Sequence, residues 1–259
     1  MRIVRDGIEI HYLVEGTGPP VMLIHGVGSD LRSWDAIAAR LAPRYRVLRL
    51  DLRGHGQSSR IETCRLEDFL DDVSSVLDAS GVARAHLVGF SLGGMIAQAF
   101  VLAHPERVEK VAFISAVAGR TAEERENVLA RARKVAEEGI ASVVAAAQGR
   151  WFTEAFQKAN PEIIRRRLEE LKANDHRSYS AAYRVFAEGD VGPCLHLIRH
   201  PTLVVTGEHD VGSNTRMARF MHEAIPGSSL HILAGLKHSV LLEAPDKIAD
   251  LLIDFLSRE

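Results

Sequence analysis

The chain has 259 residues, of which 46% are hydrophobic and 25% charged, a composition typical of a folded globular protein and not of a disordered one. The formal net charge of −2 gives no reason to expect nucleic acid or an acidic membrane surface as a partner. No apolar run approaches the roughly 20 residues that cross a bilayer, and no secretory signal is visible, so we expect a cytoplasmic protein. Cys64 and Cys194 have no C-x-x-C neighbour and are expected to be reduced, the alternative being a disulfide.

The first half of the chain alternates between short apolar runs and helical patterns. A helix opened by Ser33 is expected to carry Ile37 and Leu41 on its inner face, and further helices are expected at 65–79 and 95–103. Near-continuous apolar strands separated by helices predict an α/β fold with a mostly parallel sheet covered on both faces. The expected strands are 8–14, 20–25, 45–51, 85–88 and 108–114.

The pattern changes near residue 120, from where only helical signals follow until about 190. Thr121 to Glu124 form a capping box, and Asn160-Pro161 marks a second helix start. We interpret residues 120–192 as a helical cap inserted into an α/β core made of residues 1–119 and 193–259. In the second part of the core the expected elements are strands at 201–206 and 229–234 and helices at 214–225 and after Pro245.

A nucleophile is indicated at Ser91, because Gly89-Phe90-Ser91-Leu92-Gly93 fits the pattern G-x-S-x-G. An apolar run enters this pentapeptide and a helical run leaves it, which is the context of a sharp strand-to-helix turn that exposes a serine hydroxyl. The alternative is a chance glycine turn.

A serine hydroxyl needs a base to accept its proton and an acid to orient that base. Asp210 follows the strand at 201–206 and is the expected acid, with Glu208 as its rival. His238 follows the strand at 229–234 and is the expected base among twelve histidines. Because the carboxyl ends of parallel strands meet at one edge of the sheet, Ser91, Asp210 and His238 are predicted to lie together there.

Acyl transfer also needs N–H donors for the oxyanion. The backbone N–H of Leu92, next to Ser91, is one candidate, and that of Val27, in the loop His25-Gly26-Val27-Gly28 after an early strand, is the second. Gly26 and Gly28 superficially resemble a dinucleotide fingerprint, but the third glycine is missing because residue 31 is Leu. No Cys/His cluster suggests a metal site.

Together with the segment Asp51–Ser58, these motifs closely resemble the α/β-hydrolase fold family over essentially the whole core. The resemblance implies Ser91 as nucleophile, Asp210 as acid and His238 as base, with no cofactor, and it makes Asp51–Ser58 a structural loop. The cap segments 138–140 and 150–156 are most similar to those of 3-oxoadipate enol-lactonases and related carboxylesterases. The His-Gly form of the loop at His25 is the esterase form, where enol-lactonases often carry Asn-Ser-Leu-Gly.

The sequence therefore predicts a serine hydrolase of a small carboxylic ester or lactone, most similar to a 3-oxoadipate enol-lactonase. The alternatives are a general carboxylesterase, a C–C bond hydrolase of ring-cleavage products, and a non-catalytic small-molecule sensor. In this family, as the resemblance implies, dehalogenases and epoxide hydrolases would carry Asp where this chain has Ser91. The sequence leaves open whether the protein is a monomer or a homo-oligomer.

Substrate contacts are predicted at His25, Gly26, Trp34 and Trp151, although both tryptophans could equally pack in a core. The free carboxylate of an enol-lactone derived from a dicarboxylate would need a cationic partner. The arginines in or beside the cap are the candidates, although the triplet among them is better interpreted as a solvated helix face: Arg120, Arg150 and Arg165–Arg167.

Overall fold

The computed structural model describes residues 1–258 and contains an eight-stranded sheet with the order β1-β2-β4-β3-β5-β6-β7-β8. From β4 onward neighbouring strands are parallel, whereas β2 pairs antiparallel with both β1 and β4. The strands are β1 (Arg2–Arg5), β2 (Ile8–Glu15), β3 (Pro20–Ile24), β4 (Arg46–Leu50), β5 (Ala85–Phe90), β6 (Val108–Ile114), β7 (Thr202–Gly207) and β8 (Ser229–Leu233).

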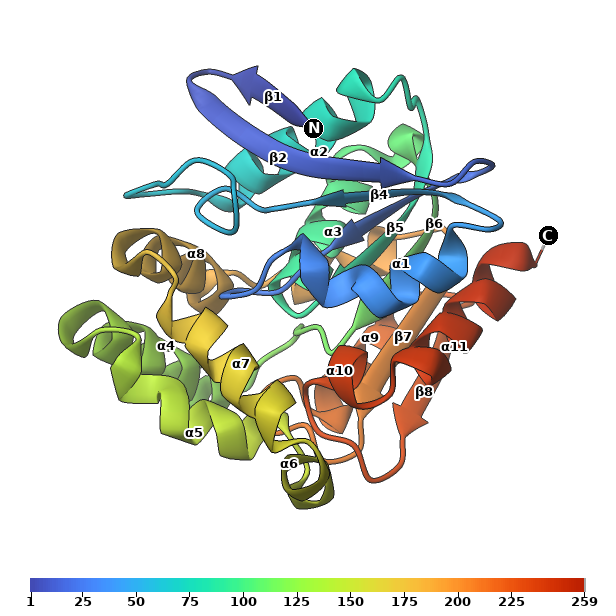
Figure 1. Ribbon diagram of the computed structural model, residues 1–259. Coiled ribbons are helices and arrows are strands. Elements are labelled where there is room, and N and C mark those ends of the chain that lie inside the picture. The colour runs from blue at the N-terminus through green and yellow to red at the C-terminus, as the bar shows by residue number, and fades with distance from the viewer. Residues whose placement is uncertain (259) are drawn as a thin grey trace.

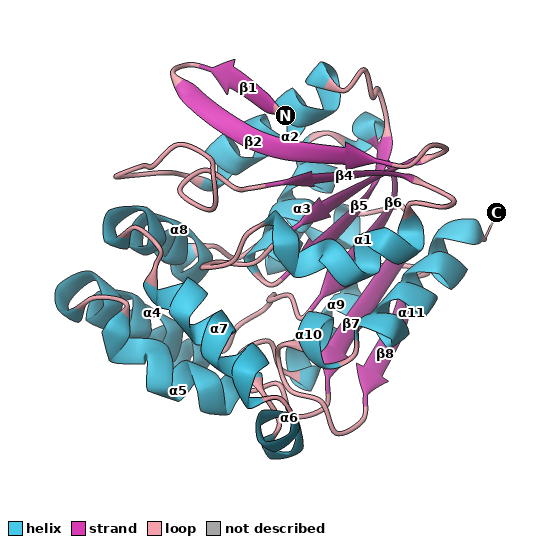
Figure 2. Ribbon diagram, in the orientation of Figure 1, coloured by secondary structure: helices cyan, strands magenta, loops and turns pink. Residues whose placement is uncertain are grey.

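Helices cover both faces of this sheet, as the alternation of strands and helices predicts (Figure 2). On one face α1 (Asp35–Leu41) and α11 (Pro245–Ser257) share an apolar core with the sheet. On the other face α2 (Leu66–Ala79), α3 (Leu92–Ala103) and α9 (Thr215–Ala224) build a second core. Two separate apolar clusters therefore fix the sheet from both sides and hold its strand ends in place.

Five α-helices lie between β6 and β7 in the chain, and Figure 1 shows them gathered at one end of the strands. We call them the cap helices; no strand interrupts residues 115–201. The capping box at Thr121 is present, with its hydroxyl accepting the N–H of Glu124 at 3.2 Å. The cap helices are α4 (Ala122–Glu138), α5 (Ala141–Trp151), α6 (Glu154–Ala159), α7 (Pro161–Lys172) and α8 (His176–Glu188).

Two local features differ from the sequence-based expectation. Ser33 does not open a helix; it lies inside a 3₁₀ turn (Leu31–Trp34) that Asp30 caps and that runs directly into α1. Strand β1 was not expected, because its residues are mostly exposed and show no apolar alternation. Among residues 1–258, no helix combines the length and the apolar character needed to cross a bilayer.

Candidate active site

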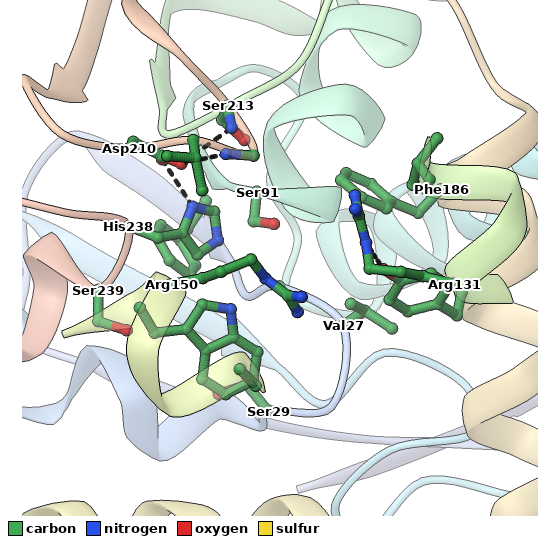
Figure 3. Close-up of a pocket in the computed structure, with 18 of the residues that line it drawn as sticks. Val27, Ser29, Ser91, Arg131, Arg150, Phe186, Asp210, Ser213, His238 and Ser239 are labelled. Carbon is green, nitrogen blue, oxygen red and sulfur yellow. Dashed lines mark hydrogen bonds and ion pairs between the residues drawn. The ribbon is translucent and has the colours of Figure 1, made fainter. Parts of the chain in front are cut away.

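Ser91 lies at a tight turn between β5 and α3. Its φ of 55° is positive, a backbone conformation that a residue with a side chain rarely adopts. Two glycines make the turn possible: a Cβ on Gly89 would lie 2.1 Å from the Gly93 carbonyl oxygen, and one on Gly93 would lie 2.2 Å from the Ile24 carbonyl oxygen. The turn has the strand-to-helix context that the sequence predicts, and Ser91 faces a cavity (Figure 3).

The loops after β7 and β8 bring an acid and an imidazole into contact. The His238 Nδ1 lies 2.7 Å from the Asp210 Oδ2, while the other Asp210 oxygen accepts the N–H groups of Gly212 and Ser213, both at 2.9 Å. Burial opposes ionisation of Asp210, but the charge and hydrogen bond of His238 and these two amides outweigh it and hold the Asp210 pKa below its ordinary value. Glu208, the rival acid, is exposed, accepts the N–H of Gly235 and lies 3.8 Å from the His209 Nε2.

A cavity of about 170 Å³ between the strand ends and the cap helices is lined by Ser91, Asp210 and His238 together. The His238 ring packs against Phe90, the residue before Ser91, with ring centroids 5.1 Å apart. Within residues 1–258 the Ser91 hydroxyl makes no hydrogen bond, so it is free to turn toward His238. In unliganded sites such bonds are often long and shorten when substrate binds.

Two backbone N–H groups beside Ser91 are unused within the described chain, those of Val27 and Leu92. Leu92 is the first residue of α3, so its N–H lies at the positive end of the helix dipole. The loop that carries Val27 approaches Ser91 closely, because a Cβ on Gly26 would lie 3.0 Å from the Ser91 Cβ. The arrangement can hold an oxyanion formed at a carbonyl carbon next to Ser91.

His25 does not face the cavity, which corrects the expectation that it contacts substrate. It is fully buried, with Nδ1 2.7 Å from the Gly26 carbonyl oxygen and Nε2 accepting the N–H of Leu52. A second buried imidazole, His55, accepts the N–H of Gly28 at 3.0 Å. Burial lowers the pKa of both rings, that of His55 to about 3. Two neutral imidazoles therefore hold the loop that carries Val27.

The two tryptophans lie in different parts of the fold. Trp34 is fully buried in the core cluster beneath α1 and α11 and does not line the cavity, so its predicted substrate contact is wrong. Trp151 and Gly26 do line the cavity. The sequence offers no way to tell whether a tryptophan next to a short helix packs in the core or lines the cavity.

Some of the arginines in or beside the cap are exposed, and others line the cavity. Arg165 and Arg166 are exposed, whereas Arg167 lines the cavity, donates to the Gly28 carbonyl oxygen at 2.9 Å and lies over the Trp151 ring. Arg120 and Arg150 line the cavity as well.

The residues that line the cavity without having been predicted include one more arginine and three aromatic side chains, Arg131, Tyr179, Tyr183 and Phe186. Arg131 did leave a signal, because it falls on the same helical stripe as the buried Val128 and Val135.

Residues 19–245 match the family described as the alpha/beta hydrolase fold. The chain is 29% identical over 254 residues to 3-oxoadipate enol-lactonase 1 of Acinetobacter baylyi, a match that covers 97% of this chain and 94% of the relative. It is 31% identical over 243 residues to (E)-2-((N-methylformamido)methylene)succinate hydrolase of the same organism, covering 92% and 90%. The crystal structure of an enol-lactonase from Burkholderia xenovorans LB400 superposes over all of both chains with a TM-score of 0.94 and 28% identity.

This chain belongs to the alpha/beta hydrolase fold family. The fold, the family and the similarity to named hydrolases define it as a hydrolase, and they confirm the resemblance to enol-lactonases that the cap motifs indicated.

Proposed function

We propose that the protein is a serine hydrolase that cleaves a carboxylic ester or lactone through an acyl-enzyme, with an enol-lactone of the 3-oxoadipate type as substrate. The observation that carries the proposal is the shared cavity, which Ser91 and the paired His238 and Asp210 face beside the free N–H groups of Val27 and Leu92. The similarity to a 3-oxoadipate enol-lactonase over nearly the whole chain supports the lactone.

In the first step the Ser91 Oγ attacks the carbonyl carbon and its proton passes to the His238 Nε2. Asp210 accepts a hydrogen bond from the Nδ1–H of His238, which keeps Nε2 available as the base and stabilises the imidazolium that forms. The negative charge that develops on the carbonyl oxygen is held by the N–H groups of Val27 and Leu92.

In the second step the tetrahedral intermediate collapses, the bond between the acyl carbon and the ring oxygen breaks, and His238 returns its proton to the departing oxygen. In a lactone this oxygen stays attached to the acyl chain, so no fragment leaves. A water molecule, deprotonated by His238, then attacks the acyl-enzyme and releases the acid with Ser91 restored.

The test compares the wild type with Ser91→Ala on an enol-lactone, a p-nitrophenyl ester and a vinylogous diketone, together with labelling by a fluorophosphonate. We expect labelling at Ser91 and a loss of lactone and ester turnover of at least about 10³-fold in Ser91→Ala. Ser75→Ala controls for the labelling, because Ser75 is a half-buried serine on α2 whose hydroxyl donates to the Asp71 carbonyl oxygen. Faster turnover of the diketone would favour C–C hydrolysis. An unlabelled protein that ligands stabilise but that turns nothing over would favour a sensor.

A further inference from the structure

The cavity carries more positive charge than its own acids balance. Four arginines line it, and none of them forms an ion pair within residues 1–258. The two acids that line it are already engaged, Glu124 with Arg216 and Asp210 with His238. The four arginines are Arg120, Arg131, Arg150 and Arg167.

Two of these guanidinium groups are held by backbone carbonyls. Arg120 donates to the carbonyl oxygens of Ala187 and Gly189, at 3.3 and 3.0 Å, and lies over the Phe186 ring. Arg167 donates to the Gly28 carbonyl oxygen. Their N–H groups fix cap residues to one another and to the loop that carries Val27, so we assign them to the framework of the cavity.

The other two have almost no partner. Arg131, on α4, makes a single hydrogen bond, to the Tyr183 hydroxyl at 3.3 Å, and Arg150, on α5, makes none among the described residues. Burial lowers the pKa of Arg150. The positive charge of Arg131 lowers this pKa further, because the two cations repel each other. A guanidinium remains protonated even so, and a pair of them facing a cavity is stabilised by an anion placed between them.

We infer that Arg131 and Arg150 together form a receptor for one carboxylate of the substrate, which makes them the residues that select an acidic ester or lactone over a neutral one. The inference rests on the proposed function. Figure 3 shows Arg150 extending from the His238 side of the cavity across the space in front of Ser91, with Arg131 on the far side beside Phe186. A carboxylate bound there leaves the scissile carbonyl of the same molecule at Ser91.

If Arg131 and Arg150 bind a carboxylate, replacing them should change the enzyme's preference for an acidic ester over a neutral one. We would compare kcat/KM for mono-p-nitrophenyl glutarate, whose far end is a carboxylate, with that for the neutral p-nitrophenyl butyrate. Arg131→Gln and Arg150→Gln are each expected to lower kcat/KM for the glutarate ester on the order of 10- to 100-fold, because a charge-assisted hydrogen bond is lost. The butyrate value should change less than about threefold, and Arg150→Lys, which keeps the charge, should recover part of the loss.

The double variant tests whether one carboxylate is shared. If both guanidinium groups bind the same group, Arg131→Gln/Arg150→Gln should lose much less than the product of the two single losses. Losses that multiply would contradict a shared receptor. Arg165→Gln is the matched control, because Arg165 is exposed on α7 and paired with Glu162 and Glu169; it should leave the preference unchanged.

Binding can be measured apart from turnover. Glutarate, which cannot be hydrolysed, should raise the melting temperature of wild type and of Ser91→Ala equally, and should not stabilise Arg150→Gln. Turnover that survives in Ser91→Ala would refute the proposed function without touching the receptor. Equal losses on both esters in the arginine variants, or stabilisation by glutarate that persists in Arg150→Gln, would refute the receptor and leave the proposed function standing.

Discussion

Glu243 in α10 (Val240–Glu243) accepts two hydrogen bonds from Thr153 at the start of α6, one from its backbone N–H at 2.9 Å and one from its hydroxyl at 2.7 Å. Two more bonds join the same stretches of chain. The Ser239 N–H donates to the Trp151 carbonyl oxygen, and the Lys237 ammonium group donates to that of Gly149. The residues on both sides of His238 are therefore bonded to the end of the helix that carries Arg150.

We call these four hydrogen bonds, donated by Thr153, Ser239 and Lys237, the clasp. They predict that Glu243 is a positioning residue for His238. Glu243→Ala should lower kcat/KM on the order of 10- to 100-fold, because a displacement of His238 by about 1 Å is enough for such a loss. It should also destabilise the protein by about 1–3 kcal/mol through the lost charged hydrogen bonds. Hydrogen exchange should rise together in residues 149–153 and 236–243.

Glu243→Gln is the matched control, because an amide at this position retains an acceptor for the Thr153 N–H and a partner for its hydroxyl. It should recover most of the activity and the protection. If exchange in Glu243→Ala increased in the cap alone, with kcat/KM unchanged, the clasp would be structural only.

Asp210 and Glu208 offer a second matched pair. Asp210→Asn should reduce ester turnover by about 10³- to 10⁴-fold, because an amide can stabilise the wrong tautomer of His238 and cannot stabilise its cation. Glu208→Gln should change turnover less than about threefold, since Glu208 is exposed and its partners, the Gly235 N–H and the exposed His209 ring, lie outside the cavity. The measurement is kcat on a p-nitrophenyl ester, with circular dichroism to check folding. Similar losses in both variants would contradict the assignment of Asp210.

Alanine substitutions at Gly93 and at Gly149 should have opposite effects on the stability of the protein. Gly93→Ala should destabilise the protein by at least about 1–3 kcal/mol and abolish turnover, because its Cβ would lie 2.2 Å from the Ile24 carbonyl oxygen and would push the turn at Ser91 out of place. Gly149→Ala, inside α5, has nothing within 4 Å of its Cβ and should stabilise by about 0.5–1 kcal/mol. Chemical denaturation of both variants measures the difference.

The turn at Ser91 could be predicted because its cause is local: two glycines and a serine within five positions force one backbone geometry. The pairing of Asp210 with His238 could be anticipated because parallel strands deliver their following loops to one edge of a sheet. Of the two receptor residues, the sequence offers Arg150 as a candidate partner of a carboxylate but does not indicate Arg131. Which side of α4 and α5 faces the cavity depends on how the cap helices pack on the core, and a charged residue on an apolar stripe is only a hint of it.

The two wrong predictions, the substrate contacts of His25 and Trp34, have the same cause, tertiary packing. His25 follows a strand at the correct edge, yet its ring turns inward to bond Gly26 and Leu52. Trp34 is close in sequence to this loop but is fully buried in the core cluster beneath α1 and α11. Proximity along the chain indicates the edge of the sheet at which a residue lies, whereas the direction of its side chain is decided by tertiary packing.

Three buried histidines make stability depend on pH. Burial lowers the pKa of His25, His55 and His86 in the folded protein, to about 3 for His55 and about 4 for His86. Below about pH 6.5 the unfolded chain binds protons at these rings and the folded chain does not, so the free energy of unfolding falls as the pH falls. Each ring contributes about 1.4 kcal/mol per pH unit until its folded pKa is reached.

His86→Leu isolates one of these contributions. His86 lies in β5 with a buried Nδ1 that has no partner in the described residues, so its replacement breaks no hydrogen bond of that atom. We expect the slope of unfolding free energy between pH 6 and pH 4.5 to be smaller in this variant than in wild type, by up to about 1.4 kcal/mol per pH unit. Urea unfolding at several pH values measures it, with His176→Gln, an exposed histidine of α8, as the control. An unchanged slope in His86→Leu would mean that folding does not lower the pKa of this ring.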